Sequence, residues 1–370
     1  MAGRYSIPRN YVAGAADSSV IQAGNQVRFR NTLLLSLFIM TGAVMARLVT
    51  EPLKNGLLIM NYRKINLTGS LRRVLQGLIL SAGLLLSAQL HAEEAMKTNY
   101  TVSFNANDAL CLVKVNDMLV TDNGGMWKGQ FTLGQTVSSY LQNGENTLSI
   151  AMLHKTADGN YELQDNMWCS AKIQDVRHGG SNEYLAAVKL IVKDGRIIPD
   201  TTYYSGRHTS FGDSPRANGF EKRFYEVSQT FYAADLPAWP WTTATPVTEN
   251  EIPAIKAFYE SLQNDFKRQD LPAIYQKTKG MWESLAVEQG STPELMWESM
   301  DYKGYFARGY KAVPIDWTGF KLNTYMGGRI FRFEIGYGRM SPLEIKNKTD
   351  EIFILTPYLS IIDGKVTVVN

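Results

Sequence analysis

The pattern of hydrophobic residues changes at a segment rich in proline and threonine, and this change divides the chain into two parts of different fold. The segment runs from Asp235 to Pro246. Proline stiffens such a stretch and excludes it from a hydrogen-bonded ladder. We therefore interpret residues 235–250 as a linker that joins a domain of residues 93–234 to a domain of residues 251–370.

The part before the linker predicts a domain of short β-strands. Thr101–Phe104 and Leu110–Val115 are rich in residues that favour strands, and turn residues follow both. Val188–Val192 leads into Asp194 and Gly195, which tolerate the positive φ of a two-residue hairpin. Frequent turns between short strands indicate a β-sandwich, and we expect a jelly-roll-like one.

One short pattern supports the sandwich. A loop leads into the sequence G-x-N-x-L-x-I, which starts at Gly144 and ends at Ile150. This pattern resembles an edge of the galactose-binding-like sandwiches. The resemblance covers residues 137–152 only.

The part after the linker begins with helices and ends with strands. Residues 249–268 repeat hydrophobic residues at helical spacing, and Thr248 and Glu251 have the spacing of a capping box. Shorter helices are expected at Pro272–Lys279 and Thr292–Met300. Strands are expected at Ile330–Tyr337, Ile352–Leu355, Leu359–Ile362 and Val366–Val369. This order is α+β, and it resembles the NTF2-like cone fold, in which helices cover a concave sheet.

Residues 60–92 have the composition of a bacterial secretory signal. Basic residues from Arg63 to Arg73 precede an apolar run from Val74 to Leu90, and Ala92 supplies a small residue at the cut. We therefore expect cleavage near Ala92 and a periplasmic mature protein. Since no cysteine stands at the cleavage site, we expect no lipid anchor there.

Residues 1–59 leave two interpretations open. They contain a second apolar stretch, Thr32–Ala46, which is shorter than the roughly 20 apolar residues of a membrane-spanning helix. Either the true start is Met60, or an N-terminal anchor precedes the second hydrophobic segment. We favour Met60, because residues 60–92 form a complete signal without help. We expect no stable membrane insertion of the mature chain.

The charge of the chain changes sign when the leader is removed. Residues 1–92 hold 10 of the 38 basic residues and 2 of the 35 acidic residues. The remaining chain has 28 basic and 33 acidic residues, which is a net charge of −5. Binding to nucleic acid requires a basic face, so we expect no nucleic-acid partner.

The mature chain contains two cysteines, Cys111 and Cys169. In an oxidising compartment such a pair predicts one disulfide. The alternative is a reactive thiol pair, which usually has C-x-x-C spacing, and this pair does not.

The histidines and serines of the mature chain form no recognisable catalytic or metal-binding motif. His154, His178 and His208 stand apart from one another and from the cysteines. Ser214 follows Gly-Asp, as in a family of serine hydrolases, but no histidine follows His208 to act as the base. We interpret residues 209–219 as a polar loop.

Three carboxylates are candidates for a cavity of the second domain, namely Asp301, Asp316 and Glu334. Glu334 alternates with the aromatic residues of its strand, so we expect it opposite the apolar face. No histidine follows residue 250. We therefore expect no catalytic residue, no metal and no cofactor.

Aromatic residues are concentrated after residue 280. Their surface could anchor a protein partner, and the alternative is that they fill the core. The partner-binding candidates are Tyr302, Tyr305, Arg308, Tyr310 and Trp317.

A sandwich joined to a helix-covered sheet, behind a secretory signal and without a catalytic set, resembles the periplasmic immunity proteins. Those proteins protect Gram-negative bacteria from toxins delivered by contact-dependent or type VI secretion. The resemblance implies a non-enzymatic protein that covers the active site of a secreted toxin. The alternative is a cell-envelope or carbohydrate-binding module, in which Trp239, Trp241 or the sandwich loops stack on glycan. A third hypothesis is an enzyme with an unrecognised site in the cone.

Overall fold

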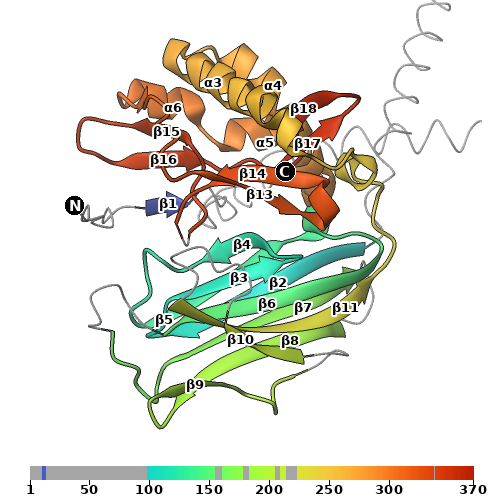
Figure 1. The fold of residues 1–370 in the computed structure, drawn as a ribbon, viewed down its shortest axis with the longest axis vertical. Coiled ribbons are helices and arrows are strands. Elements are labelled where there is room, and N and C mark those ends of the chain that lie inside the picture. The colour runs from blue at the N-terminus through green and yellow to red at the C-terminus, as the bar shows by residue number, and fades with distance from the viewer. Residues whose placement is uncertain are drawn as a thin grey trace, which may run out of the picture. The chain divides into compact units, whose positions relative to one another are not determined.

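The computed structural model describes residues 11–13, 98–154, 161–177, 183–204, 209–213, 223–336 and 338–370 (Figure 1). All the described residues belong to one unit of the chain. The predicted signal, the apolar stretch Thr32–Ala46 and the side chains of His178, His208 and Ser214 lie outside the described residues.

In the described residues, the N-terminal half contains two antiparallel sheets. One sheet has the order β5 (Gln130–Thr136), β2 (Thr98–Asn107), β7 (Trp168–Arg177), β8 (Glu183–Lys193) and β9 (Arg196–Pro199). The other has the order β10 (Thr209–Asp213), β11 (Phe224–Ala233), β6 (Gly144–Leu153), β3 (Cys111–Val115) and β4 (Met118–Asp122). Successive side chains of a strand point to opposite faces of its sheet. In both sheets, alternate side chains therefore point into one common hydrophobic core.

The predicted disulfide between Cys111 and Cys169 is confirmed. Cys111 belongs to β3 and Cys169 to β7, so the bond joins the two sheets through their common core. Neither cysteine is exposed to solvent. The predicted hairpin between β8 and β9 is also present, with positive φ at Asp194 and Gly195.

The segment interpreted as a linker is packed against both halves. It contains the 3-10 helix η4 (Pro240–Thr243), and Trp239 and Trp241 are buried beside Met118 and Tyr358. The indole Nε1 of Trp241 donates to the backbone oxygen of Ser139, 3.0 Å away. The prediction that these two tryptophans stack on glycan is therefore wrong, because their rings are enclosed.

The three helices predicted for the C-terminal half are present, one of them longer than expected, and α6 (Tyr302–Ala307) is a further helix that the sequence analysis did not predict. They are η5 (Glu249–Glu251), α3 (Ile252–Arg268), α4 (Leu271–Gln289), α5 (Pro293–Ser299) and α6 (Tyr302–Ala307). The capping box of Thr248 and Glu251 is confirmed. The helix expected at Pro272–Lys279 extends to Gln289. At Gly280 the helix backbone lies close to the backbone of Val368. A Cβ atom on residue 280 would overlap the Val368 carbonyl oxygen.

The strands of the C-terminal half form two sheets in the described residues. The first has the order β13 (Lys321–Tyr325), β14 (Ile330–Glu334), β17 (Leu359–Ile362) and β18 (Lys365–Val368). The second has the order β1 (Tyr11–Ala13), β16 (Ile352–Leu355), β15 (Leu343–Lys346) and β12 (Lys311–Ala312), with β1 parallel to β16. A chain cleaved near Ala92 would lack β1, whereas the other three strands pair among themselves.

Helices α3 and α4 lie along one side of these strands and pack on β15 and β18 (Figure 1). The fold class is therefore α+β with a strand-rich N-terminal part, as predicted. None of the described helices has the length and hydrophobicity needed to cross a membrane.

Candidate functional site

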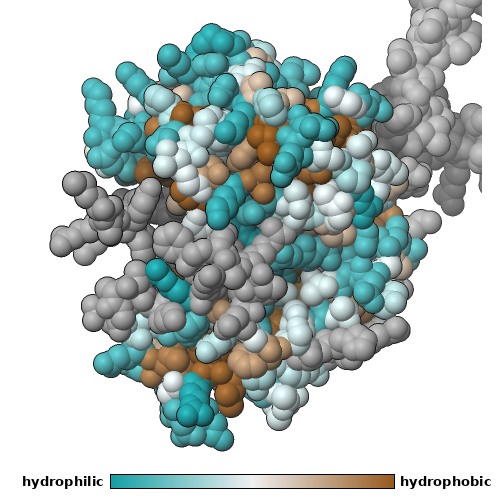
Figure 2. Space-filling model, viewed as in Figure 1, coloured by the Kyte–Doolittle hydropathy of each residue, from teal (hydrophilic) through white to brown (hydrophobic). Residues whose placement is uncertain are grey.

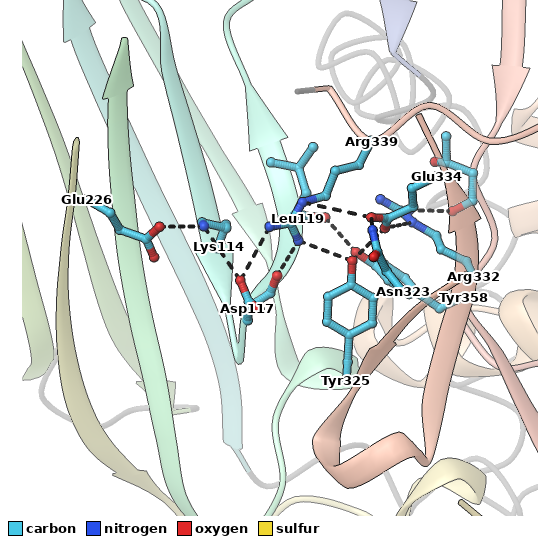
Figure 3. Close-up of polar contacts among 11 residues, drawn as sticks. Lys114, Asp117, Leu119, Glu226, Asn323, Tyr325, Arg332, Glu334, Arg339 and Tyr358 are labelled. Carbon is cyan, nitrogen blue, oxygen red and sulfur yellow. Dashed lines mark hydrogen bonds and ion pairs between the residues drawn. The ribbon is translucent and has the colours of Figure 1, made fainter. Parts of the chain in front are cut away.

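A row of charged side chains, all buried except the partly exposed Asp117, crosses from the N-terminal half to the C-terminal half (Figure 3). It starts at Lys114 on β3, where the neighbours Val113 and Val115 point into the core and Lys114 points to the opposite face. The Lys114 ammonium lies 2.5 Å from a carboxylate oxygen of Glu226 and 3.5 Å from one of Asp117. Lys114 is fully buried, so these two carboxylates compensate a charge that water does not reach.

Arg339 continues the row from the C-terminal half. Its guanidinium lies 3.3 Å from the Asp117 carboxylate and also donates to the Asp117 backbone oxygen. A third contact runs to the hydroxyl of Tyr325, 3.2 Å away. Arg339 is fully buried and has a positive φ, which a non-glycine residue adopts only where the surroundings hold it.

Glu334 and Arg332 end the row on β14. The Arg332 Nε lies 2.5 Å from the Glu334 carboxylate, which also accepts hydrogen bonds from Tyr325 (2.6 Å) and Asn323 (2.5 Å). Burial would raise the pKa of the Glu334 carboxyl, but Arg332, Arg339 and these hydrogen bonds hold it below its ordinary value. Glu334 thus lies opposite the aromatic face, as predicted, yet it is an enclosed anion held by cations.

The row contains three cations and three carboxylates that neutralise one another. A buried charge is costly without a partner, and removing one member leaves another uncompensated. These contacts therefore hold the turn after β3, which contains Asp117, in place against two parts of the C-terminal half. These parts are β14 and the loop that contains Arg339. We call this set of Lys114, Glu226, Asp117, Arg339, Glu334 and Arg332 the charged seam.

An open cleft of about 480 Å³, with polar and apolar lining, lies beside the charged seam. Its lining residues are Asn116, Gln142, Glu145, Asn146, Thr147, Pro246, Met326, Gly327 and Arg329. One wall is the start of β6, and the other is the 3-10 helix η6 (Met326–Gly328) with the residue that follows it. We call this feature the seam cleft.

Asn146 builds the first wall of the seam cleft. Its side-chain oxygen accepts from the Gln142 backbone N–H (3.0 Å) and from the Asn116 amide (2.8 Å). Its amide nitrogen donates to the backbone oxygens of Gln142 (2.8 Å) and Gly144 (3.0 Å). The asparagine of the G-x-N-x-L-x-I pattern is therefore a structural residue that fixes the turn before β6.

Arg329 builds the second wall. Its guanidinium donates to the backbone oxygens of Thr242 (2.6 Å) and Met326 (2.9 Å) and to the Gln142 side chain (3.1 Å). Its charge also lies over the ring of Trp241, 5.6 Å from the ring centroid. Four contacts therefore hold this cation in place before any ligand arrives.

No protein-family model matches the chain, and no curated protein matches it. Inference about function therefore depends on the seam cleft, the charged seam and the surface.

The predicted partner-binding residues do not form one exposed surface. Tyr302 and Tyr310 are buried in the core of the C-terminal half, and Tyr305 and Trp317 are half-buried. Arg308 is exposed and lies over the ring of Tyr305, 4.6 Å from the centroid. A partner can therefore reach Arg308 and the outer parts of Tyr305 and Trp317, and their role in binding stays a prediction.

The other carboxylates proposed from the sequence hold local structure. Asp301 accepts from the backbone N–H of Gly304 (3.1 Å) at the start of α6, and Asp316 accepts from that of Thr318 (2.9 Å). His154 stacks on Tyr225, with ring centroids 4.5 Å apart. In the described part of the chain, no group of three or more His, Cys, Asp or Glu residues could hold a metal ion.

The sequence interpretation missed Glu288, near the end of α4. Its side chain is buried and accepts hydrogen bonds from the Ser139 backbone N–H and from the Thr136 hydroxyl. Burial raises the pKa of the Glu288 carboxyl to about 7. The signal that could have revealed it is a glutamate at a position where the apolar face of the helix continues.

Proposed function

We propose that this chain is a non-enzymatic periplasmic protein that binds another protein, and that its partner is a secreted bacterial toxin. The observation that carries the proposal is the preformed seam cleft. Arg329 is already fixed by its contacts, so a partner meets an ordered cation and does not lose affinity by ordering it. Arginine is also among the residues that contribute most to protein interfaces.

The polar groups in the lining of the seam cleft support recognition of a protein loop. The seam cleft offers side-chain amides, one carboxylate from Glu145 and the Arg329 guanidinium. On the face drawn in Figure 2, hydrophobic side chains of the described residues gather in separate areas divided by hydrophilic ones. A partner at such a surface is recognised through hydrogen bonds and charge complementarity, which give specificity and a fast association rate.

The disulfide supports the location. Disulfides form and persist in oxidising compartments such as the periplasm, and the Cys111–Cys169 bond lies in the core of the N-terminal half. A periplasmic location is also what the signal at residues 60–92 predicts.

The architecture supports a more specific proposal for the fold of each half. The two opposed sheets of the N-terminal half suit a jelly-roll-like β-sandwich, since they enclose one core. The helices α3 and α4 on the C-terminal strands suit an NTF2-like domain. In this proposal residues 93–234 and 251–370 are the two domains, and residues 235–250 pack between them.

The proposal is tested by capture of a partner from a periplasmic extract, with the chain as bait and mass spectrometry as readout. Glu145→Lys reverses an exposed charge in the seam cleft and touches no ion pair of the described residues. We expect it to weaken the captured complex about tenfold or more. Glu162→Lys is the matched control, because Glu162 is also exposed and does not line the cleft.

Three outcomes would contradict the proposal: no stoichiometric protein partner, retention on glycan alone, or equal weakening by both charge reversals. Arg308→Ala in the same assay tests the partner contact predicted from the sequence. Loss of capture with Arg308→Ala but not with Glu145→Lys would move the interface from the seam cleft to α6.

A further inference from the structure

Outside the seam cleft, aromatic rings and lysine ammonium groups alternate on the sheet that contains β7 and β8. In spatial order the residues are Trp168, Lys189, Tyr203, Lys172 and Tyr184. The Lys189 Nζ lies 5.5 Å from the centroid of the first ring and 5.4 Å from that of the second. The Lys172 Nζ lies 4.7 Å and 4.5 Å from the rings on its two sides. We call these five residues the aromatic–lysine row.

The strand pattern places this row on the outer face of the sheet. Ala171 and Ile173 point into the core, so Lys172 between them points outward. Lys189 is likewise placed between two core residues of β8. Tyr203 comes from the segment after β9 and lies between the two lysines.

The charges of the row are not fully compensated. Lys189 pairs with Asp200, 3.2 Å away. In the part of the chain that the structure describes, Lys172 has ring contacts and no carboxylate within ion-pair distance. An ammonium group has three N–H donors. A ring face attracts its positive charge, but it does not accept hydrogen bonds as a carboxylate does. Lys172 thus keeps the capacity to bind an acidic group.

The rings of the row are accessible, and a polar strip lies beside them. Tyr184 is 48% exposed, and Trp168 and Tyr203 are half-buried. On the neighbouring strand β2, Ser103 pairs with Lys172 and Asn107 pairs with Trp168. Small polar side chains on that strand therefore lie beside the row. Their hydrogen-bonding groups fit a ligand rich in hydroxyls.

We propose that the aromatic–lysine row binds a saccharide that carries carboxylate groups. The rings of Trp168 and Tyr184 stack on sugar rings, Lys172 binds the acid, and the polar residues of β2 bind hydroxyl groups. A peptide strand fits less well, because β7 and β8 are paired on both sides and offer no free strand edge. This site is separate from the seam cleft and goes beyond the proposed protein partner.

The test titrates the full chain with oligogalacturonate and, in parallel, with a neutral maltooligosaccharide of the same length, by calorimetry. We expect binding of the acidic oligomer only, and an affinity about tenfold lower in Lys172→Gln and in Tyr184→Ala. Lys128→Gln is the matched control, because Lys128 lies over the ring of Trp127 (5.3 Å) outside the row and is exposed. Circular dichroism confirms that each variant is folded.

Several results would overturn the proposal. These are no binding of oligogalacturonate, equal binding of the neutral oligomer, or an equal loss in Lys128→Gln. Polyglutamate that binds as tightly and depends on Lys172 in the same way would show an acidic-peptide site. Glu145→Lys should keep the saccharide affinity, so failure of this proposal and failure of the proposed protein partner remain distinguishable.

Discussion

The carboxyl group of Glu288 lies buried where α4 meets the turn that holds Ser139. Because burial raises its pKa from 4.5 to about 7, the folded protein binds this proton more tightly than the unfolded chain does. The resulting stability is complete below about pH 4.5 and is lost as the pH rises through about 7. The loss amounts to roughly 3 kcal/mol.

Glu288→Gln tests this residue, because an amide keeps an oxygen for the Ser139 N–H and a donor for Thr136 but does not titrate. Urea unfolding is measured at about pH 5 and at about pH 8 for both proteins. We expect the variant to lose less stability between the two conditions than the original protein. An identical pH dependence would show that Glu288 is already ionised throughout this range.

The contact of α4 with β18 depends on Gly280. Glycine to alanine usually stabilises an exposed helix by about 1 kcal/mol. Here a Cβ would overlap the Val368 carbonyl oxygen, so the helix must move away from the strand. We expect Gly280→Ala to destabilise the protein by about 1–3 kcal/mol, as overpacking does.

Lys279→Ala is the control for that substitution, since Lys279 is exposed on the same helix and pairs with Glu283 only at the surface. Its effect on stability should be much smaller, because an exposed ion pair contributes little. Chemical unfolding compares the two variants. A stabilised Gly280→Ala variant would contradict the close approach of α4 and β18.

The same elements show what the sequence can reveal and what it cannot. The capping box at Thr248 and the hairpin at Asp194 are confirmed, because such signals depend on neighbouring residues. The disulfide is confirmed because two cysteines allow one pairing. The full length of α4 and the packing of Tyr302 depend on contacts with distant strands, which local periodicity does not contain.

The seam cleft and the charged seam were beyond sequence analysis for the same reason. Alternation in β14 predicted the aromatic face correctly, but it could not show that the face with Arg332 and Glu334 is covered as well. Arg339 and Asp117 are 222 positions apart in the chain. Only the folded chain brings them together.

The charged seam is one of the contacts that join the N-terminal half to the C-terminal half. Arg339→Met removes the cation between Asp117 and Glu334, so Arg332 remains as the cation beside the buried Glu334 carboxylate and Lys114 as the cation beside the partly exposed Asp117 carboxylate. We expect a loss of about 3–5 kcal/mol and two separate unfolding transitions in place of one. Calorimetry and urea unfolding by fluorescence measure both quantities.

The control is Arg308→Ala, which removes an exposed ion pair with Asp301 and should cost less than about 1 kcal/mol. If Arg339→Met is no more harmful than this control, the charged seam does not hold the halves together.

Hydrogen–deuterium exchange of the chain, alone and with its captured partner, tests most directly whether the seam cleft is the protein-binding site. We expect slower exchange in the complex at residues 142–147 and 326–329, which form the two walls. Unchanged exchange at both walls, with protection confined to α6 or to the outer sheet face, would contradict it.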